Sequence, residues 1–145
     1  MSSVTRLKTL FTFVSRAVPS TEEGLFHYLK MRYLNDLSMS EDNYEAHDCI
    51  SPKAEMLIEL KCRTTHFDEL LLEADKYHAL LIQAKKLGYA PWYVNSTPKG
   101  IYAFNLTFVA VTWTTRLLPA ATQPNPLQLV SKKVTYLHIK QARKL

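Results

Sequence analysis

Three charged residues near the middle of the chain have the types and spacing needed for phosphodiester hydrolysis. Ten residues separate Asp48 from the triplet Glu59-Leu60-Lys61, which lies within the largely apolar run EMLIELKC. In a β-strand, Glu59 and Lys61 share a face, and a turn at residues 51–53 would fold the preceding strand back so that Asp48 lies beside Glu59. Two adjacent carboxylates repel each other and favour a divalent cation, Mg²⁺ or Mn²⁺, which keeps several coordination positions for water. Lys61 would then stabilise the negative charge that develops on the phosphate.

A simpler interpretation of the same residues stays open. Alternating charges are common on exposed strands, so Glu59 and Lys61 would form an ion pair on a solvated sheet face. Asp48 would then cap a turn. The two interpretations differ in one respect: only the first requires the two carboxylates to lie side by side.

Acidic and basic residues are unevenly distributed along the chain, whose formal net charge is +5. All thirteen Asp and Glu lie at or before Asp75, where eight Lys and Arg leave a net charge of −5. From Lys76 to Leu145 there are ten Lys and Arg and no acid, which gives +10. This distribution favours an acidic half that holds a divalent cation and a basic half that holds a polyanion, although a basic surface would also aid solubility.

Hydrophobic spacing predicts the elements that position these residues. Apolar residues recur at helical intervals over residues 4–18 and about 20–37, and the second helix opens with Ser20-Thr21-Glu22-Glu23, a pattern typical of a capping box. A third helix is expected from Thr64 or Thr65 to Gly88. Alternation and turn residues predict strands at Tyr44–Ile50, Glu55–Cys62, Trp92–Asn95, Ile101–Leu106, Phe108–Trp113 and Val134–Ile139. This order indicates an α/β fold with a mixed central sheet flanked by helices.

In element order and motif, roughly residues 22–106 resemble the PD-(D/E)XK nuclease superfamily. That superfamily is similar in placing an acid on a leading helix, an Asp on one strand and Glu-x-Lys on the next, before a helix and further strands. The phrases EMLIELKCR and WYVNSTPKGIYAFNL most resemble short phage-encoded members. The resemblance implies a single nuclease-like domain over residues 1–145, with a restriction-endonuclease-like core at about 20–113 and a basic C-terminal extension at 114–145.

The resemblance also implies roles for individual residues. Asp48 and Glu59 would be the metal ligands and Lys61 the catalytic lysine. The acid of the leading helix would be Glu22 or Glu23, and whichever of the two faces the site would help to hold the metal.

Many members of the superfamily also carry a Gln and, four residues later, a Tyr on the second helix. The corresponding positions here resemble Glu73 and Tyr77, which would join the catalytic set. Tyr77 fits this pattern, whereas Glu73 departs from the usual Gln. Lys76 is a nearby alternative for the role of that Gln.

Basic residues outside the motif are candidate contacts for DNA. Arg63 and Lys99 flank the expected site, and Lys76 lies on the helix that follows it. Lys132 and Lys133 belong to the basic C-terminal segment, for which a solvated tail is the alternative. Contacts of this kind with phosphates add affinity that depends on salt and not on base sequence.

Two Cys and two His flank the same two strands and offer an alternative metal site. His47, Cys49, Cys62 and His66 have the residue types of a tetrahedral zinc site. However, residues two apart on a strand share a face, so His47 and Cys49 would point away from Asp48. Buried thiols and surface imidazoles are the more common outcome.

Composition bounds the function classes. The chain is 47% hydrophobic with three Gly and two Cys, which excludes a disordered chain, a disulfide scaffold and a glycine-rich phosphate loop. No apolar run is long enough to cross a membrane, so we expect a cytoplasmic protein. The favoured function is a metal-dependent deoxyribonuclease, and the need to cut both strands of a duplex favours a homodimer. The alternatives are a catalytically inactive nucleic-acid-binding module on the same fold and a basic protein-binding adaptor.

Overall fold

The computed structural model describes residues 18–41, 47–120 and 128–145, so the helix expected over residues 4–18 lies almost entirely outside the described residues. Within these ranges the helices are α2 (Glu22–Arg32) and α3 (Ala74–Leu87), and a short 3-10 turn, η1, covers Ile139–Gln141. The strands are β1 (Ser38–Met39), β2 (Cys49–Ser51), β3 (Met56–Cys62), β4 (Glu69–Glu73), β5 (Ala90–Thr97), β6 (Gly100–Asn105), β7 (Thr114–Pro119), β8 (Leu129–His138) and β9 (Arg143–Lys144).

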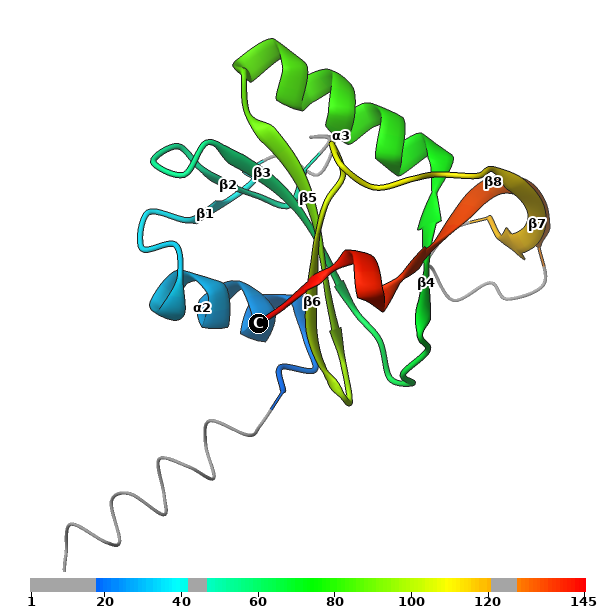
Figure 1. Ribbon diagram of the computed structural model, residues 1–145, viewed down its shortest axis with the longest axis horizontal. Helices are drawn as coiled ribbons and strands as arrows, with labels where there is room; N and C mark the ends of the chain where they lie inside the picture. Colours follow the sequence, from blue (N-terminus) through cyan, green and yellow to red (C-terminus); the bar gives the residue numbers. More distant parts are fainter. Residues whose placement is uncertain (1–17, 42–46, 121–127) are drawn as a thin grey trace, which may run out of the picture.

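The strands form two sheets. The larger sheet has the order β1-β2-β3-β5-β6-β9 and is mixed, because β3 and β5 run parallel whereas the other neighbours are antiparallel. The smaller sheet has the order β4-β8-β7 and is antiparallel. In Figure 1 the large sheet lies at the centre, with α2 on one side and α3 and the small sheet on the other. The expected mixed central sheet flanked by helices is thus confirmed.

The first turn of α2 differs in detail from the expected capping box. The Thr21 side chain accepts a hydrogen bond from the amide of Gly24 (3.0 Å), so Thr21 is the N-cap. Gly24 then occupies the position where a capping box requires Glu or Gln. Glu22 and Glu23 therefore lie in the first turn, where acidic side chains interact favourably with the helix dipole.

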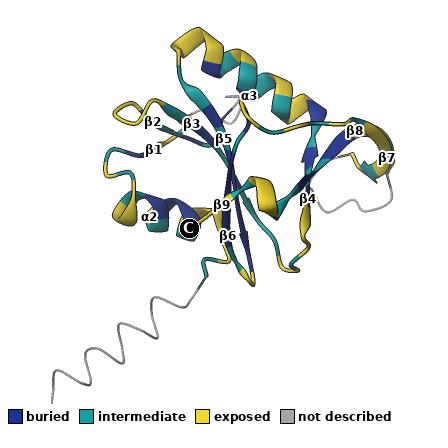
Figure 2. Cartoon of the chain, in the orientation of Figure 1, coloured by how far each residue is buried: buried dark blue, intermediate teal, exposed yellow. Residues whose placement is uncertain are grey.

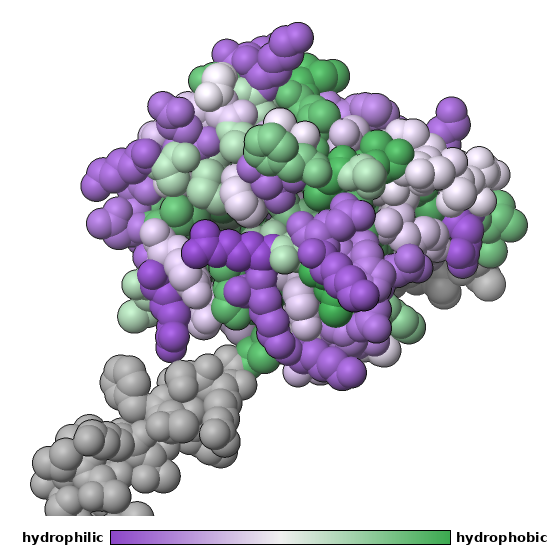
Figure 3. All heavy atoms as spheres, viewed as in Figure 1, coloured by the Kyte–Doolittle hydropathy of each residue, from purple (hydrophilic) through white to green (hydrophobic). Residues whose placement is uncertain are grey.

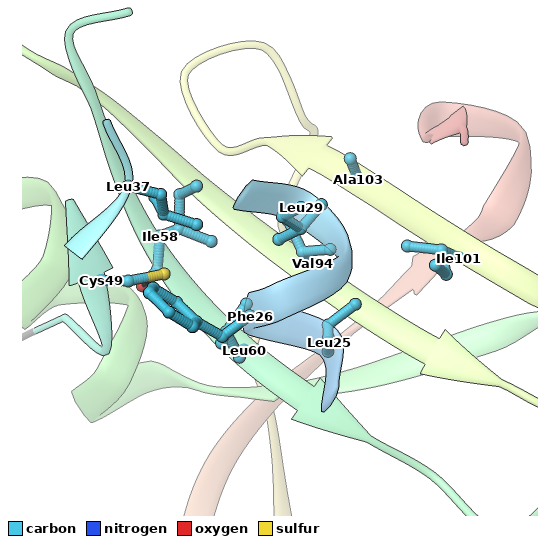
Figure 4. Packing of buried hydrophobic residues seen from close by; sticks show 10 residues of the cluster. All are labelled: Leu25, Phe26, Leu29, Leu37, Cys49, Ile58, Leu60, Val94, Ile101 and Ala103. Carbon is cyan, nitrogen blue, oxygen red and sulfur yellow. Dashed lines mark hydrogen bonds between the residues drawn. The ribbon is translucent and has the colours of Figure 1, made fainter. Parts of the chain in front are cut away.

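One face of the large sheet is covered by α2. Leu25, Phe26 and Leu29 of the helix are buried against alternate residues of the central strands (Figure 4), among them Ile58, Leu60 and Val94. This is the face to which the even-numbered residues of β3 point, as alternation predicts.

The opposite face of the large sheet packs against α3 and the small sheet. Its core contains buried residues of the central strands, of α3 and of the small sheet: Leu57, Tyr93, Phe104, Leu80, Ala84, Leu70, Leu72 and Leu137. Figure 2 shows the central strands in the colour of buried residues, whereas the outer sides of both helices are exposed. Glu59 and Lys61 belong to this face because they alternate with Ile58 and Leu60.

The helix expected from Thr64 or Thr65 begins about ten residues later, at Ala74. Residues Glu69–Glu73 form β4 instead, because Leu70 and Leu72 alternate into the core and the strand pairs with β8. Gly88 ends α3 in the left-handed conformation (φ 71°), as expected for a C-terminal glycine.

One strand prediction needs correction and another is confirmed. Residues 108–113 carry no strand, since β6 ends in a turn in which the amide of Phe108 donates to the carbonyl of Asn105 (3.1 Å). The segment after residue 113 supplies β7, β8 and β9, and β8 contains most of the strand expected at Val134–Ile139. The amide of Leu145 donates to the carbonyl of Ile101 (2.9 Å), which ties the described C-terminus to the large sheet.

The surface is mostly polar on the face drawn in Figure 3, with smaller apolar areas between hydrophilic side chains. Across the residues with a described placement, no helix has both the length and the apolar character needed to cross a membrane.

Candidate active site

Asp48 is placed beside Glu59 by the pairing of β2 with β3. The two strands are antiparallel, with Cys49 opposite Ile58, so the next step along the ladder brings Asp48 opposite Glu59. The amide of Asp48 donates to the carbonyl of Ile58 (3.0 Å), and its carboxylate Oδ2 accepts from the amide of Leu60 (2.8 Å). The Asp48 side chain thus replaces a main-chain acceptor at the point where β2 begins, and this bond fixes its orientation.

The tight turn at residues 52–55 is held from outside by Asp36. Ser51 Oγ donates to Asp36 Oδ1 (2.6 Å) and the Lys53 amide donates to Oδ2 (2.8 Å). These bonds lower the pKa of Asp36, so the carboxylate stays ionised and keeps the β2–β3 register that the site requires.

Glu59 is the most perturbed carboxyl group of this cluster. Its side chain is only 13% exposed and accepts an ion-paired hydrogen bond from Lys76 Nζ (2.9 Å) in the first turn of α3. Burial, followed by the negative charge of Asp48, raises the pKa of Glu59 to about 7, although Lys76 acts in the opposite direction. The two carboxyl groups therefore lie close together, and ionisation of both at once is unfavourable.

Only one of the two acids on the leading helix interacts with this cluster. Partial burial and the charge of Asp48 raise the pKa of Glu22, whereas Lys61 and Lys76 lower it, so Glu22 lies within electrostatic reach of all three. Glu23 is 86% exposed on the outside of the helix, and its closest charged neighbour is His27 (3.9 Å). Glu22, and not Glu23, faces the cluster.

Glu73 and Tyr77 make contacts elsewhere. Glu73 is the residue before α3 and accepts from Lys132 Nζ (3.4 Å), and Tyr77 packs its ring against Trp113 (centroids 5.2 Å apart). The expectation that both lie on the helix is wrong for Glu73, because β4 extends to that residue. Lys76, proposed as the alternative, is the residue of α3 that reaches Glu59.

The other basic residues predicted to contact DNA lie in three different settings. Arg63 is held by Asn95, Tyr93 and the carbonyl of Leu71. Lys99 lies exposed in the β5–β6 turn, near enough to Asp68 to lower the pKa of that carboxyl group together with the larger effect of His66. Lys132 pairs with Glu73, and Lys133 is exposed on β8.

Comparison with solved structures gives an independent view of the fold. The chain is similar to Hjc of Archaeoglobus fulgidus, a Holliday junction resolvase, with a TM-score of 0.57 at 15% identity over 86% of this chain and 88% of that chain. The chain has the restriction-endonuclease-like fold. No family model matches the sequence, and no curated protein matches it. The likeness is one of fold, and it agrees with the fold that the resemblance implied.

The donor set of this fold fits a magnesium or manganese ion. Mg²⁺ is commonly held by one or two carboxylates and keeps several waters, and Asp48 and Glu59 supply two carboxylates beside each other. No group of three or more His, Cys, Asp or Glu within residues 18–41, 47–120 and 128–145 is arranged to hold a metal. A cation at Asp48 and Glu59 would therefore retain much of its water shell.

The alternative zinc site finds no support in the geometry. Cys49 is fully buried among apolar residues beneath α2, and burial, together with the charges of Asp48 and Glu59, raises the pKa of its thiol to about 12. His66 contacts Thr97 Oγ1 (2.9 Å) through one ring nitrogen and Asp68 (3.0 Å) through the other. The two residues face different surroundings and have other partners.

Sequence reasoning missed the residues that hold Arg63. Asn95 is fully buried and Tyr93 is 4% exposed, and both bond to the guanidinium from β5. The signal was present in the strand WYVNST, where a polar Asn interrupts a buried apolar run. A buried amide needs a partner, and a neighbouring Arg is a suitable one.

Proposed function

We propose that this protein is a nuclease that hydrolyses DNA phosphodiester bonds with the help of a bound divalent metal ion. The observation that carries the proposal is the pair Asp48 and Glu59, two crowded carboxyl groups on a fold similar to that of a Holliday junction resolvase. Burial and the charge of Asp48 raise the pKa of Glu59 to about 7, so full ionisation of the pair is unfavourable without a further cation. A bound metal would supply that positive charge, polarise the phosphate and lower the pKa of a bound water.

The residues around the pair have distinct proposed roles. Asp48 and Glu59 would hold the ion, and Glu22 would bind one of its waters. Lys61, on the same strand face as Glu59, would orient the phosphate and stabilise the charge that develops on it. Lys76 would lower the pKa of Glu59 in the metal-free protein through its ion pair. We propose no catalytic role for Tyr77, whose ring lies against Trp113.

The basic half of the chain supports nucleic acid as the substrate. Several of its cations have exposed side chains, including Lys85, Lys99 and Lys133, and these are suited to phosphate contacts. Cleavage of both strands of a duplex would require either a homodimer or two successive events at one site.

The decisive experiment incubates the purified chain with supercoiled, branched and single-stranded DNA in Mg²⁺, in Mn²⁺ and in EDTA. We expect cleavage that requires metal and is lost in Glu59→Gln and Lys61→Met but kept in Glu23→Gln. Metal-dependent cleavage that persists in Glu59→Gln and Lys61→Met would contradict the proposed site. Binding without any cleavage would favour the alternative, an inactive nucleic-acid-binding module.

A further inference from the structure

A pocket of about 740 Å³ lies at the end of β3, beyond the candidate active site. Its walls come from the segment between β3 and β4, from the outer face of the small sheet and from β7. This volume is in the usual range of sites for small organic groups. Neither the sequence motif nor the proposed hydrolysis uses it.

The first notable feature of the pocket is a pair of arginines without acidic partners. Arg63 and Arg116 both line it, and neither forms an ion pair with an acid in the part of the chain that the structure describes. Arg63 is fixed from behind: its Nε donates to Asn95 (2.8 Å), and its Nη2 donates to Leu71 O (2.7 Å) and to Tyr93 (3.0 Å). Its Nη1 donates to no described residue, which leaves an oriented donor for an anion.

The second feature is a set of aromatic groups at the same place. Phe67 is 61% exposed although it lies against the pocket. Tyr136 lies beside Arg116, whose guanidinium carbon is 5.8 Å from the ring centre and whose Nη1 donates to the Tyr136 hydroxyl (2.5 Å). Flat rings and guanidinium planes are the surfaces on which unstacked nucleobases bind. An acidic peptide would use the arginines but would leave these rings without a function.

The third feature is a pair of acids suited to the edge of a base. Asp68 and Glu69 also line the pocket, and a hydrogen bond from His66 lowers the pKa of Asp68, so this carboxylate is ionised. Carboxylates accept from the amino groups of bases. His138 also lines the pocket. Its Nδ1 accepts from the Lys140 amide (3.1 Å), so in the neutral ring Nε2 carries the proton and is a hydrogen-bond donor.

We infer that this pocket binds one unpaired nucleotide of a DNA strand, with its base between Phe67 and Tyr136 and its phosphate on Arg63 and Arg116. A paired base in a duplex exposes only its edges, so it cannot enter such a pocket without being unpaired and unstacked. The inference rests on the proposed function for the identity of the ligand as DNA and adds to it a preference for unpaired regions.

The pocket lies near the candidate active site along the chain. Glu59 and Lys61 of β3 alternate with Arg63, the residue that directly follows β3, so Glu59 and Arg63 are about 13 Å apart at about 3.3 Å per residue. Tyr93 lies between them: its hydroxyl accepts a hydrogen bond from Arg63, and the charge of Glu59 is close enough to contribute to the raised pKa of Tyr93. A strand anchored in the pocket would therefore pass the two carboxylates within a few nucleotides.

The test measures DNA binding in EDTA, where no hydrolysis occurs. The probes are a single-stranded oligonucleotide with one 2-aminopurine and the same oligonucleotide in a duplex. We expect Phe67→Ala to weaken single-strand binding about 5- to 100-fold, with no change for the duplex, and to abolish the quenching of 2-aminopurine that stacking causes. Arg116→Ala should weaken binding and lower the salt slope of the single-strand complex by about 0.7.

Matched controls come from exposed residues outside the pocket. Phe108→Ala removes an aromatic ring that is 84% exposed, and Lys86→Ala removes an exposed cation, and both should leave the quenching and the single-strand preference unchanged. Circular dichroism verifies that each variant is folded. Phe67 and Arg116 are both exposed, so their loss should not unfold the chain.

Several outcomes would overturn the inference. These are equal affinity of Phe67→Ala and wild type for the single strand, equal loss for single strand and duplex, and displacement of the DNA by polyglutamate. Binding of free dAMP as tight as that of the oligonucleotide would show a mononucleotide site instead. Because no cleavage is measured, a failure of the proposed nuclease activity leaves this result interpretable on its own.

Discussion

The candidate active site and the nucleotide pocket lie one after the other, on β3 and on the residues that follow it, yet they differ in which charged groups lack a partner within the protein. At the first, Asp48, Glu59 and Glu22 share the positive charge of Lys61 and Lys76, and the pKa of Glu59 is raised. At the second, Arg63 is held only by neutral acceptors, although Asp68 and Glu69 also line the pocket. The carboxyl groups of the first site therefore favour a cation, and the guanidinium of Arg63 at the second favours an anion.

Because of this difference, the two regions can bind different parts of one substrate. A nucleic acid in the presence of Mg²⁺ brings both missing charges together, since the ion satisfies the carboxylates and a phosphate satisfies the guanidinium. Around these sites, among the residues described, Lys76 pairs with Glu59, Lys132 pairs with Glu73, and His66 contacts Asp68. The remaining charges are left for the ligand.

The largest expected effect separates the two regions by function. Glu59→Gln should reduce DNA cleavage by more than about 100-fold, because substitutions of mere outer partners of a metal already cost 10- to 100-fold. It should leave single-strand binding in EDTA within about twofold of wild type. Phe67→Ala should instead weaken single-strand binding in EDTA. Its cleavage of an unpaired substrate should fall only in proportion to this loss of binding. A loss of binding in Glu59→Gln would show that the two regions are not independent.

The pH dependence of stability should reveal the unbalanced charge of the first region. The pKa of Glu59 is about 7 in the folded chain and near 4.5 when unfolded, so the folded state binds the proton more tightly. The free energy of unfolding in EDTA is therefore highest below pH 4.5 as far as this group is concerned, and it falls by at most about 3 kcal/mol as the pH rises through 7.

Urea denaturation at pH 5 to 8 measures this effect. Glu59→Gln should remove that part of the pH dependence, whereas Glu23→Gln, at an exposed position, should keep it. Ten millimolar Mg²⁺ should stabilise the wild type more at pH 8 than at pH 6, because the ion competes with the proton. Equal stabilisation of wild type and Glu59→Gln by Mg²⁺ would place the ion elsewhere.

The second region should lose stability when its arginine is removed. Arg63→Ala removes the described donor to Asn95 Oδ1 and one donor to Leu71 O. This loss should lower the free energy of unfolding, measured by urea denaturation, by about 1–3 kcal/mol. Arg63→Lys should recover only part of this, because an ammonium cannot reproduce the planar arrangement of the guanidinium. Arg116→Ala, at an exposed position, should change stability by less than about 0.5 kcal/mol. A cost for Arg116→Ala equal to that for Arg63→Ala would contradict this distinction.

The sequence predicted the first region far better than the second. Alternation in β3 and the turn before it were sufficient to bring Asp48 beside Glu59, because both depend on local pattern. The pocket depends on β4, which was expected to be helical since Leu70, Ala74 and Tyr77 have helical spacing. Pairing with β8, more than fifty residues later, decides the strand, and no local pattern reveals such pairing. The nucleotide pocket was consequently invisible in the sequence.

The smallest expected effect tests whether Lys76 acts on the ionisation of Glu59 or on the DNA. Below pH 7 Lys76 favours metal binding because it lowers the pKa of Glu59, whereas above pH 7 Glu59 is ionised in any case and the ammonium competes with the metal. Lys76→Met should therefore weaken the apparent Mg²⁺ affinity at pH 6.5 and strengthen it at pH 8.5, each by about two- to fivefold, as is usual for a half-exposed ion pair. Titration of cleavage with Mg²⁺ at the two pH values measures both changes, with Lys86→Met as the control. A shift in the same direction at both pH values would mean that Lys76 acts on the DNA and not on Glu59.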